Sequence, residues 1–99
     1  RHCEGHCMKD NIVRNDNLGR FECPVEGGMA IAVFHQEGEV LVFTHTEVPP
    51  QAQGRGAASR LIAAALEDVR ERGLRVRPLC SFVRRYMEDH PDTRDLLAD

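Results

Sequence analysis

Apolar and polar positions alternate in short runs along the first half of the chain, and turn-forming residues separate these runs. The runs are 12–14, 20–25, 29–36 and 39–48. Alternation with a period of two is typical of β-strands, so the pattern predicts a meander of four antiparallel strands. Residues 40–43 are all apolar, which indicates a central strand that is covered on both faces.

The second half of the chain has the apolar spacing of helices. Five apolar residues recur at i, i+1, i+4, i+5 and i+8, which places them on one helical stripe. They are Leu61, Ile62, Ala65, Leu66 and Val69. This stripe predicts a helix over residues 56–72, and Gly73 after it is a typical C-terminal stop.

A short strand and a second helix complete the predicted order. The strand covers residues 75–79, the helix covers 82–90 and ends before Pro91, and the tail 92–99 has room for one further turn. The order is β-β-β-β-α-β-α, in which a crossover normally lays two strands parallel. We therefore predict an α+β fold: a mixed sheet with an antiparallel meander, one parallel crossover and a helix on each face.

The chain length and the N-terminal residues suggest one domain after a short leader. A chain of 99 residues is too short for two independent cores, so residues 9–99 are predicted to form one domain. Residues 1–8 have no apolar periodicity and end in Met8, a candidate natural start, so we interpret them as a flexible leader that could be vector-derived. The leader carries four potential metal ligands, His2, Cys3, His6 and Cys7. They are crowded within six residues, so no native metal site is expected.

Charge and hydropathy exclude several classes of function. Thirteen Lys and Arg against sixteen Asp and Glu give a net charge of -3, which disfavours a protein that neutralises many phosphates of a nucleic acid. No apolar run approaches the ~20 residues that span a bilayer, and no secretory signal is evident. We therefore expect a cytoplasmic protein, and we interpret its four cysteines as thiols.

The segment between the fourth strand and the first helix has the composition of an anion site. Gly54, Gly56, Ala57 and Ala58 keep side chains away, so backbone N–H groups at the helix start can converge on a phosphate. Arg55 and Arg60 can add positive charge. The segment lacks both the Lys-Ser/Thr ending of a P-loop and the Gly-x-Gly-x-x-Gly of dinucleotide sites. A flexible βα turn is the alternative.

This loop also resembles a known motif. Its Gln-x-x-Gly-x-Gly pattern, which starts at Gln51, is similar to the acetyl-CoA-binding motif of the GNAT superfamily of N-acetyltransferases. The segments 43–49, 53–56, 58–61 and 78–83 look like the minimal single-domain GNAT-like branch. The resemblance implies that acetyl-CoA is the cosubstrate. It implies cofactor contacts from Val48, Gln51, Gln53, Gly54, Arg55, Gly56, Ala57, Ala58 and Arg60.

The same resemblance implies a V-shaped opening between the fourth and fifth strands, where the acetyl group would lie. By strand alternation His45 and Glu47 share the face of Leu41 and Phe43 unless a bulge intervenes, and Cys80 ends the neighbouring strand. We therefore expect His45, Glu47 and Cys80 to converge beside the thioester.

Two chemical routes are open to these three residues. In direct transfer, our preferred route, Glu47 or His45 takes a proton from the ammonium substrate and the amine attacks the thioester. In the second route Cys80 is acetylated first. Each residue also has a structural interpretation: a half-buried histidine, a Glu47 ion pair with Arg55 or Arg60, and a packed cysteine.

Other residues keep two interpretations. Cys23 belongs to a core alternation, Arg84 and Arg85 lie either on an exposed helix face or near cofactor phosphates, and Tyr86 is either core or close to the leaving thiol. We predict an N-acetyltransferase that acts on an unidentified amine, with a protein or peptide amine as one candidate. A CoA-binding module with little turnover is the alternative, and a metal-handling protein built on the leader is a third hypothesis.

Overall fold

The computed structural model describes residues 12–54 and 56–98, and the leader prediction for residues 1–8 lies outside them. The strands are β1 (Val13–Asn15), β2 (Arg20–Val25), β3 (Gly28–Glu37), β4 (Val40–Glu47) and β5 (Arg75–Pro78). The helices are α1 (Ala57–Glu71) and α2 (Ser81–Asp89), with 3-10 turns η2 (Pro50–Ala52) and η3 (Pro91–Leu96). Each predicted strand and helix is present, with ends that differ by at most one residue.

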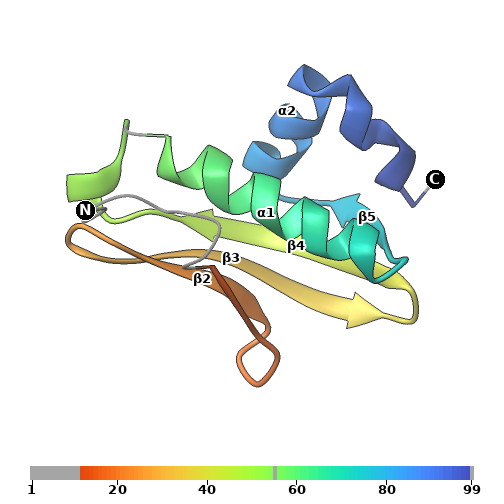
Figure 1. Cartoon of the computed structure of the whole chain (residues 1–99), viewed down its shortest axis with the longest axis horizontal. Helices are drawn as coiled ribbons and strands as arrows, with labels where there is room; N and C mark the ends of the chain where they lie inside the picture. The colour runs from red at the N-terminus through yellow and green to blue at the C-terminus, as the bar shows by residue number, and fades with distance from the viewer. Residues whose placement is uncertain (1–11, 55, 99) are drawn as a thin grey trace.

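The five strands form one mixed sheet in the order β1-β2-β3-β4-β5 (Figure 1). The first four strands pair antiparallel, and β5 pairs parallel to β4 after the crossover through α1. The predicted α+β fold with a meander and one parallel crossover is therefore confirmed.

The core lies between this sheet and α1. Phe21 of β2, Phe34 of β3 and Phe43 of β4 stand side by side, with ring centroids 5.2 to 6.2 Å apart. Leu61 and Ile62 of α1 are fully buried in the same cluster. Burial of each such side chain contributes roughly 1.5–3 kcal/mol, so this layer holds α1 on the sheet.

The second helix packs on the same side as the first. Val83 and Met87 of α2 and Leu96 of η3 belong to the same buried cluster as α1. Arg70 of α1 forms an ion pair with Asp95 of η3, at 2.7 Å. In Figure 1, α1, α2 and η3 accordingly lie to one side of the strands.

The predicted arrangement with one helix on each face is therefore wrong in its layers. Opposite α1 the sheet carries half-buried and exposed residues, such as Ile31, Val33 and His35, which we call the open face. Val42 is buried on this face, at 2% exposure. In the register Val42 lies between His35 and Arg77. The stems of long side chains can shield a small apolar residue, so an apolar run need not imply a second helix.

One extra residue in β4 changes which side chains reach the core. Phe34 pairs with Phe43, but the next residue back, Val33, pairs with His45, so Thr44 is a bulge. A bulge adds a residue on one strand only and inverts the later alternation. Beyond the bulge, Thr46 pairs with buried Ala32 and faces α1.

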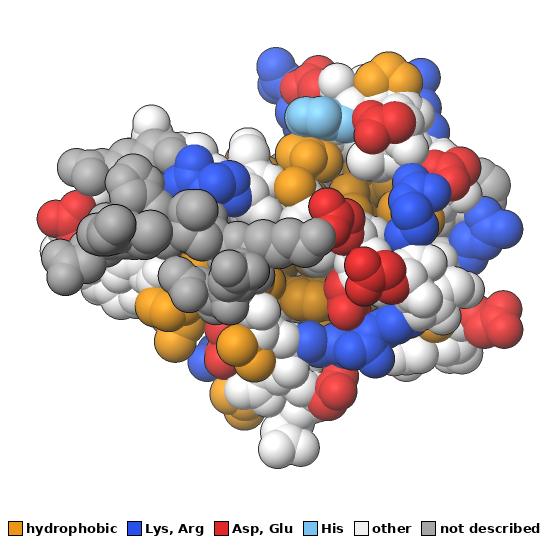
Figure 2. All heavy atoms as spheres, in the orientation of Figure 1, with side chains coloured by type: hydrophobic (Ala, Val, Ile, Leu, Met, Phe, Trp, Pro, Cys, Tyr) orange, Lys and Arg blue, Asp and Glu red, His pale blue; other side chains and the backbone are white. Residues whose placement is uncertain are grey.

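The C-terminal half of α1 is fixed by charged contacts. The guanidinium of Arg14 in β1 lies over the Phe34 ring, 4.9 Å from its centroid, and pairs with Asp68 of α1 at 3.3 Å. Arg72 also pairs with Asp68, at 2.8 Å. Figure 2 shows acidic and basic side chains side by side over this half of the helix. The opposite end of α1, its start, lies at the candidate site.

Candidate active site

The strands β4 and β5 diverge after a short parallel ladder. Their pairing ends at Phe43 and Pro78. The carbonyl oxygen of Phe43 then accepts hydrogen bonds from the backbone N–H groups of Leu79 and Cys80, at 3.0 and 2.9 Å. Beyond this point β4 continues beside β3 while the chain at Cys80 turns into α2. The V-shaped opening predicted between the fourth and fifth strands is present.

A groove of about 470 Å³ lies beside this opening. The end of β4, the loop after it and the starts of α1 and α2 supply its walls. Its lining residues are Thr46, Val48, Ala52, Gln53, Gly54, Gly56, Ala57, Ala58, Ser59 and Phe82. Most of these side chains are small or apolar, so the groove suits a slender chain that carries a polar group at one end.

The start of α1 provides the polar end of this groove. Gly56 is the N-cap with a φ of 78°, and Gly54 has a φ of 80°, a region that favours glycine. Gly56 has no side chain to cap the helix, and the first turn carries no acidic residue. The first N–H groups of a helix and its dipole favour an anion there. The fold thus places the two predicted glycines at the start of α1, and anion binding there stays a prediction.

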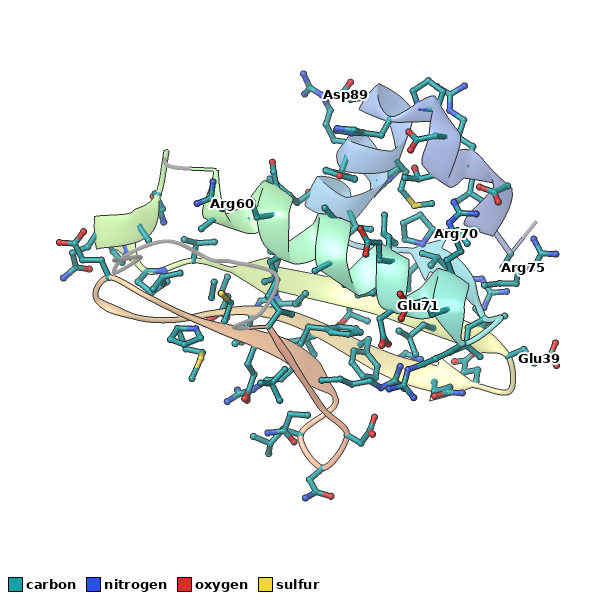
Figure 3. The ribbon with its side chains drawn as sticks, in the orientation of Figure 1. Glu39, Arg60, Arg70, Glu71, Arg75 and Asp89 are labelled. Atoms are coloured by element: carbon teal, nitrogen blue, oxygen red, sulfur yellow. The ribbon has the colours of Figure 1, made fainter. Side chains whose placement is uncertain are left out.

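Arg60 lies over the same turn. A Cβ atom on Gly56 would lie 3.1 Å from the Nη1 atom of Arg60, so its guanidinium packs against the glycine. Figure 3 shows Arg60 on the first turn of α1. Its positive charge lies beside the helix start, and its contact with the cofactor stays a prediction. Arg55 lies outside the described residues, so its predicted role stays a prediction.

The two glutamines of the loop have different surroundings. The Nε2 atom of Gln53 donates to the carbonyl oxygen of Val48 at 3.0 Å, and both residues line the groove. Gln51 instead packs on the β2–β3 turn, where a Cβ on Gly27 would lie 2.3 Å from Oε1 of Gln51. Gln51 therefore supports the loop from behind, and the structure does not bring it into the groove.

Cys80 meets an unpredicted partner at the opening. It is the N-cap of α2, and 9% of it is exposed. Its Sγ atom lies 3.3 Å from Oγ1 of Thr46, within hydrogen-bond distance for sulfur. Thr46 was missed from sequence because plain alternation places it on the other face, and only the bulge at Thr44 turns it toward the core.

His45 and Glu47 lie on the open face, away from Cys80. They pair with Val33 and Ile31, whose side chains point away from α1. Nε2 of His45 and Oε2 of Glu47 share a hydrogen bond, and the side chains are 53% and 60% exposed. The predicted convergence of His45, Glu47 and Cys80 on one face is therefore wrong, because the bulge intervenes. Glu47 hydrogen-bonds His45, and Arg55, one of its two predicted arginine partners, lies outside the described residues.

Apart from Phe82, which lines the groove, the residues of α2 that the sequence singled out belong to packing and to the surface. The Tyr86 ring stacks on His90, with centroids 3.9 Å apart. Burial raises the pKa of Tyr86, and the charges of Asp92 and Glu67 raise it further. Arg85 pairs loosely with Asp89 at 3.8 Å, and Arg84 is exposed. Tyr86 is half-buried and packs against the core, and the arginines lie on an exposed helix face.

The remaining cysteine and metal predictions have mixed outcomes. Cys23 is fully buried, as its alternation predicts. It is disulfide-bonded, so the interpretation of all four cysteines as thiols is wrong there, whereas Cys80 is a free cysteine. His2, Cys3, His6 and Cys7 lie outside the described residues. Within residues 12–54 and 56–98, no three His, Cys, Asp or Glu side chains gather as a metal site.

The helices give one further result on membranes. In the part of the chain that the structure describes, no helix has both the length and the apolar character to cross a bilayer.

Comparison with known proteins decides the family. The family model of the GCN5-related N-acetyltransferases matches residues 20–96. The chain belongs to this family. The resemblance drawn from the loop at Gln51 and the segments around it is thus confirmed, because the match includes them all.

Individual relatives of this GCN5-related chain are similar over shorter stretches. NATD1 proteins of chicken (Gallus gallus) and human (Homo sapiens) are each 35% identical over 63 residues, or 63% of this chain. These stretches span 57% and 56% of the relatives' own lengths. A solution structure from Staphylococcus aureus, described as GCN5-like, has a TM-score of 0.64 at 21% identity. It covers 87% of this chain and 85% of the other, and it shows the shared fold.

Proposed function

We propose that this protein is an N-acetyltransferase that moves the acetyl group of acetyl-CoA to an amine. The observation that carries the proposal is the groove from the glycine-capped start of α1 to the opening between β4 and β5. A helix start suited to an anion at one end and the opening between β4 and β5 at the other fit a cosubstrate with a pyrophosphate and a distant thioester.

The groove residues divide the binding of CoA between two chemistries. Gly54, Gly56, Ala57 and Ala58 present backbone N–H groups to the pyrophosphate, and Arg60 adds positive charge. Val48, Ala52 and Phe82 line the groove beside the pantetheine arm. When bound, acetyl-CoA supplies an activated acetyl thioester. Gln51 supports the loop from the β2–β3 turn.

Direct transfer is the route that the two faces of the sheet favour. The His45 and Glu47 pair is exposed on the open face, where a carboxylate and an imidazole can take the proton that an attacking amine must lose. The amine nitrogen then bonds to the acetyl carbon, and the CoA sulfur leaves with the electron pair. The acetyl-Cys80 route is less favoured, because within the described residues the hydrogen-bonding side chain beside Cys80 is a hydroxyl, not a base.

The open face also bears on the acceptor. The described helices all pack on the other side of the sheet, so their side chains build no enclosure around His45 and Glu47. An enclosed pocket is typical of small-molecule sites, whereas an exposed pair is accessible to an amine on a large molecule. We therefore propose a protein or peptide amine as the acceptor.

Release of CoA tests the activity. The protein is mixed with acetyl-CoA and with lysine peptides, polyamines or free amino acids, and the free thiol of CoA is followed. We expect amine-dependent release that is fastest with peptides. Binding of CoA without amine-dependent release would establish the alternative, a CoA-binding module. Intact mass after exposure to acetyl-CoA tests the covalent route, and an acetyl group on Cys80 would replace direct transfer.

We propose that the protein is located in the cytoplasm. The disulfide at Cys23 is the observation against it, because disulfides are rare in the cytosol. Fractionation of the source cells, with thiol labelling before lysis, measures both properties. Recovery outside the cytoplasm with an oxidised Cys23 would overturn this location.

A further inference from the structure

The contact between Thr46 and Cys80 joins two chain segments where their backbone pairing has ended. The last backbone hydrogen bonds between β4 and the segment after β5 are those of the Phe43 carbonyl oxygen, and Thr46 lies three residues further along β4. Its Oγ1 atom still reaches Sγ of Cys80 at 3.3 Å. This side-chain contact spans the opening beside the groove.

We propose that Thr46 is a positioning residue of acetyl transfer: its hydroxyl donates to Cys80 Sγ and aims the Cys80 S–H at the leaving CoA sulfur. The proposal rests on the proposed function. It gives Cys80 the task of proton donor rather than nucleophile.

Hydrogen bonds fix the backbone of Cys80, so only the orientation of its side chain remains to be determined by a neighbour. The N–H of Cys80 donates to Phe43 at 2.9 Å, and its carbonyl oxygen accepts from the N–H of Arg84 at 3.0 Å. Both backbone groups are thus fixed by neighbours. Thr46 is the described side chain within hydrogen-bond distance of the sulfur, and either atom can be the donor. With the hydroxyl as donor, the proton of Cys80 is left for the CoA sulfur.

The bulge explains why a threonine can do this. In a regular strand Thr46 would lie on the face opposite to Phe43, which is the open face. The bulge at Thr44 changes this alternation. With the bulge, Thr46 faces α1 and lines the groove, where it is half-buried. Thr44 keeps its own hydroxyl on a different partner, the carbonyl oxygen of Val33 at 3.5 Å. The two threonines form a matched pair for an experiment.

The proton balance of the step is complete. The amine nitrogen bonds to the acetyl carbon and loses its proton to the His45 and Glu47 pair, which returns it to solvent. The carbon–sulfur bond of the thioester breaks, and the CoA sulfur takes the electron pair and the proton of Cys80. Cys80 regains a proton from solvent. The products are an amide and free CoA, and no oxidant or reductant is needed.

Turnover in a mutant cycle tests the positioning. Thr46→Val removes the hydroxyl at nearly constant size, Thr46→Ser keeps it, and Thr44→Val is the control. We expect Thr46→Val to lower kcat roughly tenfold with little change in the KM for acetyl-CoA, as the loss of about one hydrogen bond predicts. Thr46→Ser restores most of the rate. In a Cys80→Ala background, Thr46→Val has no further effect; an equal loss there would overturn the proposal.

Alkylation of Cys80 provides a readout that needs no turnover. Iodoacetamide reacts with the thiolate, and a hydroxyl that donates to the sulfur stabilises this form. Peptide mass mapping should therefore show roughly tenfold slower labelling of Cys80 in Thr46→Val, and unchanged labelling in Thr46→Ser and Thr44→Val. Equal or faster labelling in Thr46→Val would overturn the contact. If Thr46→Val slows the labelling of Cys80 but the wild type shows no acetyl transfer, the contact between Thr46 and Cys80 is retained and the proposed function is refuted. Acetyl-Cys80 formed during turnover would overturn the donor role.

Discussion

Beyond its bulge, β4 presents two different surfaces. On one face the half-buried Thr46 contacts Cys80 beside the groove, whose walls include small residues and the N-termini of α1 and α2. On the other face His45 and Glu47 pair with each other in solvent, with more than half of each side chain exposed. Adjacent residues along one strand therefore have opposite environments, and the cofactor and the acceptor can approach from different sides of the same sheet.

This difference suggests an experiment, because the binding of CoA and the removal of a proton from the amine would involve different residues in the proposed reaction. Residues on the groove face should control CoA affinity and the departure of the sulfur. Residues on the open face should control proton removal from the amine. A substitution on one face that altered both properties equally would contradict the division.

The largest effect is expected at Glu47. Glu47→Gln removes the carboxylate that we propose as the proton acceptor on the open face, and general bases contribute about 10²–10⁴ to rate. We expect kcat to fall about a hundredfold, with CoA affinity unchanged because Glu47 does not line the groove. Turnover and isothermal titration with CoA measure the two quantities.

The chain offers a matched control for that substitution. His35 and Glu37 of β3 form the same kind of pair, with a hydrogen bond of 2.8 Å and more than half of each side chain exposed. Glu37→Gln should leave turnover unchanged. If both variants lose the same activity, the effect belongs to surface charge and Glu47 is not the base.

A smaller effect is expected at the start of α1. Gly56→Val fills the helix start, strains a φ of 78° and pushes Arg60 aside. Charge interactions at a helix terminus reach about 2 kcal/mol, so CoA affinity should fall about tenfold or more. Gly38 has a φ of 63° with nothing within 4 Å of a Cβ, so Gly38→Val tests strain alone. Unchanged CoA binding in a folded Gly56→Val would contradict the phosphate site.

Much of the groove face was predictable from sequence because glycine carries a strong backbone signal. Gly54 and Gly56 both adopt positive φ, which few other residues do, and they precede a helix with clear apolar spacing. Gly73, with a φ of 70°, likewise marked the end of that helix. These residues predicted the start and the end of α1, and the anion site itself stays a prediction.

The open face was not predictable, because a bulge at a threonine leaves no mark in a strand. Threonine is common in strands, so Thr44 looks like an ordinary strand residue, yet it inverts the faces of His45 and Thr46. The disulfide at Cys23 was missed for a similar reason, since pairing of cysteines cannot be deduced from sequence alone.

The smallest expected effect lies far from both surfaces of β4, at the contact of α1 with η3. Nη1 and Nη2 of Arg70 donate to the two carboxylate oxygens of Asp95, at 2.7 and 3.0 Å (Figure 3 labels Arg70). These hydrogen bonds, together with the charge of Arg70, lower the pKa of Asp95. The ionised carboxylate therefore stabilises the fold above its ordinary pKa. This contribution is lost as the pH falls through the lowered value.

Asp95→Asn should lower the melting temperature slightly at neutral pH. The pair is exposed to solvent, so we expect a shift near the detection limit of the measurement, and salt should reduce it further. In acid the wild type loses the same contribution, and the two melting curves should converge. Asp89, whose nearest cation lies 3.8 Å away, supplies the control Asp89→Asn. A difference in melting temperature that persisted in acid would mean that Asp95 acts through packing. CoA turnover should be the same in the wild type and in both variants, because this contact reaches neither face of β4.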